Sequence, residues 1–485
     1  MSTDSQESEQ GKHEAQMMAD FIEQWLGNGS IREFMRFCTR RDQCGRRIEH
    51  ALKSYIGEHE HVCIRCRLAA FAIRRFMGMI LSKTKGDEQE VKQYLKDPMW
   101  RKGLASVLEG IAEWGPRKPF TAYAPFLIVW NVTRMCNLQC RHCYALAGMR
   151  DPHELNPEEA LKAVDDMAHA GLAYIALSGG EPLIRPDIFD IIERIRKNGM
   201  AFSIATNATV LTPERARRLK ELNCLYVQVS VDGATAKTHN WFRGRNSFEL
   251  TCKGIQNAVE AGIHVGVATT VTQHNYQEVP EIINLAEQLG AKTFMHYNFV
   301  PTGRGEDIIN LDLTPDQRSE LLNMLAAETK KRKISLLSTA PHYSKVCIEK
   351  QAATLAMTHF DNSQITQDNP LSVLADFIGG CGTGRLYCAL DYDGSITPCV
   401  FIPIKLGNIR TDSLLDIWHN SEVFKKIRDR ENFWGACGTC SYRNVCGGCR
   451  ARAYGYFRDL SGPDIGCSLN KEYWEKVKEG IPATT

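Results

Sequence analysis

The chain has 485 residues, with 59 Lys and Arg against 57 Asp and Glu, so its formal net charge of +2 is close to neutral. This balance, without any long block of one sign, argues against a nucleic-acid or other polyanion partner for the whole chain. Residues 1–15 are polar and acidic without the apolar core of a signal peptide, and no apolar run reaches membrane-spanning length. We therefore expect a cytoplasmic protein of about three domains, with no membrane span and a disordered tail over residues 1–15.

Cysteine is abundant, with 18 residues in the chain. A reducing compartment keeps thiols free, so these cysteines are better explained as metal ligands than as disulfides. Thiolate-rich metal sites of this kind also indicate an oxygen-poor, anaerobic cell.

Residues 16–118 are expected to form a separate helical domain. The segments 18–25, 48–55 and 68–76 have helical apolar spacing, and no β alternation is present. This region also contains Cys38, Cys44, Cys63 and Cys66, the last two as C-x-x-C. The four cysteines form either a zinc or extra iron-sulfur site or ordinary thiols packed in a helical core. Prolines at 116 and 119 then mark the domain boundary.

Residues 119–305 alternate strand and helix at the interval expected for repeated βα units. Helical patterns, for example at 157–170 and 187–198, separate the strands. The region therefore predicts an α/β fold with a partial six-stranded (β/α)6 TIM-like barrel. The strand candidates are residues 126–132, 172–177, 201–206, 225–231, 264–271 and 293–300.

A cysteine loop follows the first of these strands. Cys136, Cys140 and Cys143 are spaced C-x-x-x-C-x-x-C directly after the apolar run 126–130. Three thiolates this close can hold three corners of a four-iron cluster, and the fourth iron then stays open to an exogenous ligand. A zinc knuckle or a redox-silent loop is the alternative that spacing alone leaves open.

These three cysteines and the following Tyr144 resemble the signature of the radical S-adenosylmethionine (SAM) superfamily. The resemblance implies a catalytic [4Fe-4S] cluster whose open iron chelates the amino and carboxylate groups of SAM. It further implies that one electron from the cluster cleaves SAM to a 5′-deoxyadenosyl radical, and that SAM and Tyr144 lie beside each other.

The polar ends of later strands fit the same resemblance. Ser178–Pro182 is similar to the family's GGEP motif, in which two glycines allow close backbone approach and a carboxylate accepts from the amine of SAM. Thr206, Ser230, Asn207 and Asp232 occupy strand ends that resemble SAM-lining positions, although they are also ordinary turn residues. Arg243 either pairs with the SAM carboxylate or is a surface arginine. The cofactor-binding residues expected are Tyr144, Gly179, Gly180, Glu181, Thr206, Ser230 and Arg243.

Residues 306–375 are expected to form a helical connector. Thr314 is a helix N-cap followed by Pro315 in the first turn, and an apolar stripe continues through Leu321, Leu322 and Leu325. The polar stretch at 359–370 is either a cover over the barrel mouth or a plain surface loop.

Eight cysteines gather in residues 376–472, followed by a tail over 473–485. Their spacing is similar to the SPASM domain, which implies two auxiliary [4Fe-4S] clusters that act as electron conduits; two zinc sites are the alternative. The resemblance assigns Cys381, Cys388, Cys399 and Cys449 to one cluster, and Cys437, Cys440, Cys446 and Cys467 to the other. Cys224, Cys252 and Cys347 remain outside these sets and are expected to be small buried hydrophobes.

We therefore expect a radical SAM enzyme that takes its electron from a ferredoxin or flavodoxin. Residues 398–403, 407–410, 427–430 and 446–454 resemble the tetrapyrrole branch that acts in anaerobic heme and heme d1 biosynthesis. Val400 stands where sulfatase-maturing relatives carry an aspartate base, and Arg450 and Arg452 are candidates for substrate carboxylates or for cluster-shell residues. The expected reaction is removal of a side-chain fragment from an iron tetrapyrrole. A peptide or protein maturase and an iron-sulfur electron-transfer protein are the alternatives.

Overall fold

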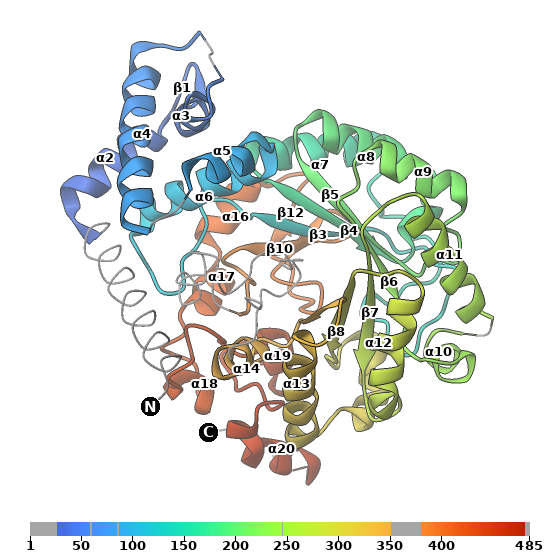
Figure 1. Cartoon of the computed structure of the whole chain (residues 1–485). Coiled ribbons are helices and arrows are strands. Elements are labelled where there is room, and N and C mark those ends of the chain that lie inside the picture. Colours follow the sequence, from blue (N-terminus) through green and yellow to red (C-terminus); the bar gives the residue numbers. More distant parts are fainter. Residues whose placement is uncertain (1–26, 59–60, 85–86, 245, 351–379, 481–485) are drawn as a thin grey trace.

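The computed structural model describes residues 27–58, 61–84, 87–244, 246–350 and 380–480 (Figure 1). The tail expected over residues 1–15 and the cover expected at 359–370 lie outside the described residues. The expected domain boundaries stay predictions. None of the described helices combines the length and apolar character that crossing a bilayer requires.

A curved sheet of ten strands, in the order β12-β11-β10-β3-β4-β5-β6-β7-β8-β9, organises the described residues. Neighbours from β10 and β3 through to β9 pair in parallel. The α/β partial barrel is therefore confirmed. The strands are β3 (Leu127–Thr133), β4 (Tyr174–Gly179), β5 (Ala201–Thr206), β6 (Tyr226–Ser230), β7 (Val265–Val271), β8 (Thr293–Asn298) and β9 (Ser335–Ser338).

The strand β9 was not expected, because residues 306–375 were predicted to be a helical connector. It is four residues long and pairs in parallel with β8 at the edge of the barrel. Two central leucines between serines are too short a run to show a strand period in the sequence. The helix that begins at Thr314 is present as α13 (Pro315–Thr329), with a capping box formed by Thr314 and Gln317.

The outer layer consists of helices that cover the convex face of the barrel sheet (Figure 1). They pack apolar stripes against the strands, for example Ile188, Ile191, Ile192 and Ile195. This interface between helices and sheet is the main core. The helices are α7 (Pro157–Ala170), α8 (Ile188–Lys197), α9 (Pro213–Glu221), α10 (Ala236–Arg243), α11 (Phe248–Glu260), α12 (Val279–Gln288), α13 and α14 (Tyr343–Glu349).

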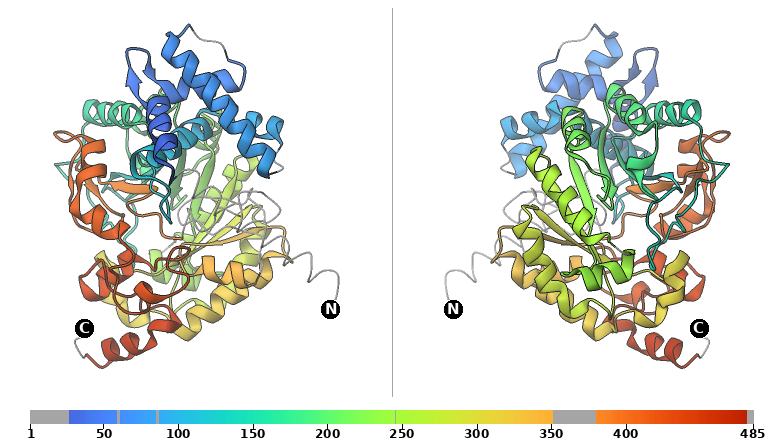
Figure 2. Two further views of the ribbon diagram at one scale, coloured as in Figure 1. Left: turned by 90° about the vertical axis from the view of Figure 1, so that its left-hand side faces the viewer. Right: turned by 90° about the vertical axis from the view of Figure 1, so that its right-hand side faces the viewer.

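The amino-terminal helices form a second, smaller core at one end of the barrel (Figure 2). A short hairpin, β1 (Arg41–Asp42) with β2 (Gly45–Arg46), interrupts them, so the region is not helical throughout as expected. Strands of two residues are too short to show alternation in the sequence. The helices are α2 (Gly29–Thr39), α3 (Arg47–Tyr55), α4 (Ile64–Thr84), α5 (Glu88–Lys96) and α6 (Pro98–Trp114).

The carboxy-terminal region extends the barrel sheet and then folds against its open side. The strand β10 (Tyr387–Leu390) pairs with β3, and β11 (Ser395–Thr397) and β12 (Gly407–Asn408) continue as antiparallel strands. The following helices are α16 (Leu414–Asn420), α17 (Glu422–Arg428), α18 (Ala436–Thr439), α19 (Arg450–Phe457) and α20 (Lys471–Lys478).

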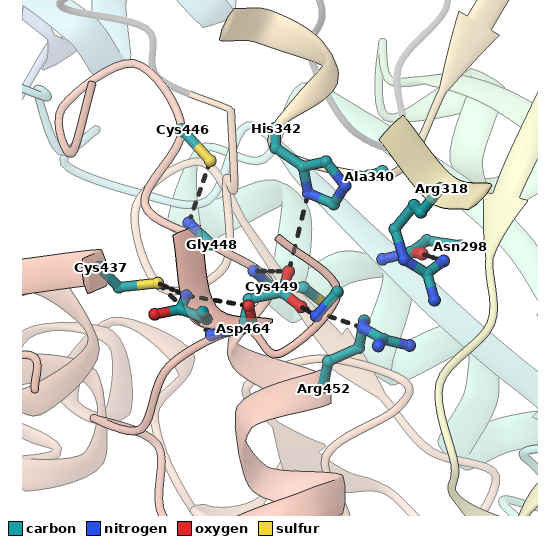
Figure 3. A network of polar contacts seen from close by, with 12 residues as sticks. Asn298, Arg318, Ala340, His342, Cys437, Cys446, Gly448, Cys449, Arg452 and Asp464 are labelled. Carbon is teal, nitrogen blue, oxygen red and sulfur yellow. Dashed lines mark hydrogen bonds and ion pairs between the residues drawn. The ribbon is translucent and has the colours of Figure 1, made fainter. Parts of the chain in front are cut away.

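A buried network of charges joins this region to the barrel (Figure 3). Arg452 of α19 donates to Asp464 at 3.0 Å and to Asp312 at 2.9 Å, and Arg318 of α13 donates to the other oxygen of Asp312 at 2.6 Å. All four side chains are fully buried. Burial alone would raise the pKa of Asp464, but the charge of Arg452 holds it well below its usual value. Because a buried charge is costly without its partner, this network fixes the carboxy-terminal region on the barrel.

We expect Arg452→Met to lower the free energy of unfolding by about 3–5 kcal/mol, because it leaves Asp464 and one oxygen of Asp312 buried without their cation. Arg458→Met is the matched control: Arg458 ends the same helix, and its exposed side chain forms an ion pair with Glu306 and lies over the ring of Tyr454. Urea unfolding followed by circular dichroism measures both. Equal midpoints for the two variants would contradict a stabilising role for the network.

Candidate active site

Cys136, Cys140 and Cys143 lie in the loop that leaves the carboxyl end of β3 and line the mouth of the barrel pocket. The ends of the loop are closed by backbone hydrogen bonds, from Cys136 N to Gly148 O and from Gly148 N to Arg134 O, both at 2.9 Å. The loop is therefore an arch held at its base, and the structure brings the three cysteines together at one end of the pocket.

The surroundings of these thiols fit a negatively charged iron-sulfur cluster. Backbone N–H groups of Leu138 and Ala147 point at the sulfurs of Cys136 and Cys143, each at 3.4 Å. Burial raises the pKa of Cys136 to about 12, so its thiol stays protonated unless a cation is present. Bound iron provides that positive charge, and the N–H donors then stabilise the sulfur ligands.

The two glycines of Ser178–Pro182 press their backbone directly against the cysteine arch. A Cβ on Gly180 would lie 2.0 Å from the carbonyl oxygen of Met135, and one on Gly179, whose φ is +123°, would lie 2.5 Å from that of Thr133. Gly180 N also donates to Thr133 O at 2.7 Å. Only glycine permits this approach, which sets the position of the arch over β4.

Glu181 is buried beneath these glycines and does not line the pocket. Its carboxylate accepts hydrogen bonds from Thr206 Oγ1 at 2.7 Å, Asn207 N at 2.8 Å and Leu183 N at 3.0 Å. Its expected role as acceptor for the SAM amine stays a prediction. In this structure it ties the end of β5 to the end of β4.

Arg243 is not a surface arginine: it is buried and held by Asp232 at 2.6 Å, with Nη1 3.9 Å from the sulfur of Cys140. His142 lies 3.3 Å from the same carboxylate, and burial lowers the pKa of this imidazole to about 4. Arg243 therefore places a positive charge beside Cys140, and its expected pairing with SAM stays a prediction.

Arg304 is a pocket residue that the sequence did not reveal. Its Nε donates to Cys140 O at 2.7 Å and its Nη1 to Ala147 O at 2.9 Å, while its buried Nη2 has no hydrogen-bond partner among the described residues. The preceding Gly303 has φ +57°, and a Cβ there would meet Cys143 O at 2.5 Å. The signal that could have found this site is the Thr-Gly-Arg-Gly run after a strand end.

The remaining expected residues line the pocket from several strands. Thr206 and Ser230 stand at the ends of β5 and β6, and Tyr144 donates to Asn131 at 3.1 Å and contacts Ser178 at 3.0 Å. The ring of Tyr144 packs edge-on against Phe401 with centroids 4.8 Å apart. The pocket wall is thus shared by the barrel and the carboxy-terminal region.

Cys437 and Cys446, two members of the second expected cluster set, lie near Asp464 (Figure 3). Backbone N–H groups lie 3.4 Å from Cys437, 3.4 Å from Cys440 and 3.3 Å from Cys446. These N–H donors are placed as in the arch and suit negatively charged sulfur ligands. The assignment of Cys437, Cys440, Cys446 and Cys467 to one cluster stays a prediction.

The first auxiliary set needs a correction. Cys381, Cys399 and Cys449 line one small pocket, where Tyr387 donates to the sulfur of Cys399 at 2.7 Å. Cys388 follows Tyr387 on the same strand, so its side chain points to the opposite face, where it is buried in the core beneath the helices. The structure therefore brings three of the four expected thiols together, and the Cys388 side chain lies apart from them.

Arg450 and Arg452 are also placed differently from the substrate-binding interpretation. Arg450 donates to the carbonyls of Leu460 at 2.9 Å and Gly462 at 2.8 Å and stacks on Phe433, and Arg452 belongs to the buried charge network. Both arginines are buried, and their guanidinium groups bind other parts of the protein.

Comparisons with known proteins agree with this architecture. A family model described as "Radical SAM superfamily" matches residues 130–286, and the SPASM model, described as "Iron-sulfur cluster-binding domain", matches residues 381–449. The chain is 37% identical over 337 residues to the AdoMet-dependent heme synthase of Methanosarcina barkeri, covering 68% of this chain and 93% of that one.

One further relative and one solved structure are also similar to this chain. The mycofactocin maturase MftC of Mycobacterium tuberculosis is 30% identical over 351 residues, covering 71% of this chain and 83% of that one. The crystal structure of Streptococcus suis SuiB bound to S-adenosylmethionine superposes with a TM-score of 0.61 at 15% identity, covering 87% of this chain and 92% of that one. The latter likeness concerns the fold alone.

The first prediction from this site separates Cys388 from the auxiliary ligands. Cys388→Ala should leave iron content and the clusters' electron paramagnetic resonance spectrum unchanged, because the side chain lies on the far face of β10. Cys449→Ala should lose about four irons per chain, because it removes a ligand of one cluster. Equal iron loss from the two variants would return Cys388 to the ligand set.

The second prediction concerns Arg304. We expect its buried Nη2 to donate a hydrogen bond to the carboxylate of SAM. Arg304→Met should therefore weaken SAM binding about 10- to 100-fold, since a charged hydrogen bond contributes about 1.5–3 kcal/mol. Equilibrium dialysis of reconstituted protein with labelled SAM measures the affinity, and iron content shows whether the arch still holds its cluster. Arg134→Met, on the outer side of the same arch, is the control. Unchanged SAM affinity with full iron content would rule out this role for Arg304.

Proposed function

We propose that this chain, which belongs to the radical SAM superfamily and carries a SPASM-type iron-sulfur domain, removes a side-chain fragment from an anionic iron tetrapyrrole. The proposed reaction begins with hydrogen abstraction from a propionate or acetate chain of the macrocycle. A low-potential ferredoxin or flavodoxin is the proposed electron donor.

The iron-sulfur cluster and SAM, when bound, supply the 5′-deoxyadenosyl radical that abstracts this hydrogen. The chain's own residues are proposed to place the reactants. Cys136, Cys140 and Cys143 hold the cluster at the pocket mouth, and Gly179 and Gly180 let the arch that carries these cysteines lie against β4. Arg304 then binds a carboxylate of SAM through its buried Nη2.

The observation that supports a macrocyclic substrate is the character of the pocket below the cysteine arch. Part of its wall is apolar and contains Val129, Ala176, Ala268, Met295 and the aromatic rings of Tyr174, Tyr226, Tyr297 and Phe401, while Ser203, Gln228 and Thr270 also line the pocket. The proposed place of the macrocycle is against this apolar part, where small side chains stand beside large flat ones.

The similarity to the heme synthase of Methanosarcina barkeri supports the same substrate class. A peptide or protein maturase is the second candidate, and the observation that favours it is the 30% identity to the mycofactocin maturase. Both candidates use radical SAM chemistry, so the proposed distinction rests on what fills the apolar part of the pocket.

The substrate test incubates reduced enzyme and SAM with iron-coproporphyrin, with didecarboxysiroheme, and with small peptides encoded beside the gene. We expect a tetrapyrrole to lose mass and to transfer deuterium from labelled side chains into 5′-deoxyadenosine. Ala176→Leu places a larger side chain in the pocket. It should reduce the rate of product formation at least tenfold while leaving substrate-independent SAM cleavage intact.

Two outcomes would contradict the proposal. Deuterium transfer from a peptide and from neither tetrapyrrole would favour the maturase. Full product formation by Ala176→Leu would show that the macrocycle does not lie against this wall.

A further inference from the structure

A further cluster of thiols lies in the amino-terminal region, apart in sequence from the eleven cysteines considered above. Cys44 is in the turn of the β1–β2 hairpin, Cys63 directly precedes α4, and Cys66 is in the first turn of that helix. Their three sulfur atoms lie within 4.8 Å of one another, with Cys63 and Cys66 separated by 3.5 Å. Both family models begin after residue 129, so this cluster belongs to a part of the chain that they do not describe.

The distances distinguish between the chemistries open to three thiols. A disulfide needs sulfurs about 2 Å apart, so Cys63 and Cys66 are not bonded to each other. Around one tetrahedral zinc ion, with Zn–S of about 2.3 Å, two sulfurs lie about 3.8 Å apart. In a four-iron cluster each thiolate binds a different iron, and the sulfurs are spread more widely than around a single ion.

We propose that Cys44, Cys63 and Cys66 bind one mononuclear zinc ion, with water as the fourth ligand. Thiolate sulfur is the ligand type that selects zinc over harder divalent ions. Cys38, which the sequence grouped with these residues, is fully buried in the apolar core of the helices and is not part of the site. Burial raises the pKa of Cys38 to about 11, as expected for an inert core thiol.

The position of the site gives it a structural consequence. The hairpin that carries Cys44 contacts both the barrel and the amino-terminal helices: Arg41 donates to His169 O at the end of α7 at 3.1 Å, and Arg46 forms a buried ion pair with Glu109 of α6. Its strands are two residues long and have little core of their own. Zinc ties this hairpin to the start of α4 and so holds both arginines in place.

The test uses the full-length protein, reconstituted anaerobically with iron and sulfide and then supplied with one equivalent of ZnCl2. We expect one zinc per chain by mass spectrometry of the metals. X-ray absorption at the zinc edge should show about three sulfur neighbours at about 2.3 Å and one lighter atom. The triple variant C44S/C63S/C66S should lose this zinc while keeping its iron, and hydrogen exchange of residues 41–46 should become at least tenfold faster.

Cys252→Ser is the matched control, since Cys252 is a half-buried cysteine of α11 outside every group described. If the triple variant fails to fold, Cys63→Ser alone tests the site, because the exposed Cys63 can change without loss of core packing. We expect it to weaken zinc affinity at least tenfold. Zinc retained by both variants, or a wild-type zinc edge showing fewer than three sulfurs, would overturn the proposal. Iron in place of zinc at the triad would also overturn it.

Discussion

The pairing of β3 with β4 on one side and β10 on the other is the constraint on which the candidate site depends. Trp130 of β3 lies opposite Leu177 and Leu390, so segments about 260 residues apart meet in one register. The arch that leaves β3 therefore lies over the glycines that end β4, and Phe401 reaches the ring of Tyr144. A shift of one residue in this register would turn Tyr387 away from Cys399 and bring Cys388 into its place. The sheet thus decides which thiols face which pocket.

The barrel could be predicted because each of its units satisfies local rules that are visible in the chain. The helix at 157–170 has an N-cap, a proline in its first turn, an apolar stripe and Gly171 as a left-handed stop, and all four are present in α7. The strand β9 and the β1–β2 hairpin could not be predicted in this way. They are only four and two residues long, too short to show a strand period, and β9 in addition pairs with a strand about 40 residues away.

The candidate site shows the same contrast between features visible in a short stretch of sequence and features that only the folded chain creates. The arch and the two glycines were recognisable because each is a short motif in the chain, although the contacts of the glycines with Thr133 and Met135 appear only in the structure. Glu181 and Arg243 bind groups at the ends of other strands, and Arg452 binds Asp312, which is 140 residues away, so sequence patterns could not show that these charges are already paired. Cys388 shows the limit of counting cysteines, because alternation along β10 decides its direction. Arg304 was missed because its role depends on two carbonyls of the arch.

The buried charges shared by α13 and α19 also bear on how such proteins can be recombined. Asp312 and Arg318 belong to the barrel side, and Arg452 and Asp464 to the cysteine-rich side; each pair is balanced in charge, and Arg452 joins the two pairs by also binding the second oxygen of Asp312. A chimera that takes its carboxy-terminal region from a relative would therefore need the matching arginine and aspartate together. A region that carried only one of them would bury an unpaired charge at the seam. The two regions differ in sequence pattern but share one buried charge network. Exchange of the carboxy-terminal region between relatives therefore has to preserve the contact between Arg452 and Asp312.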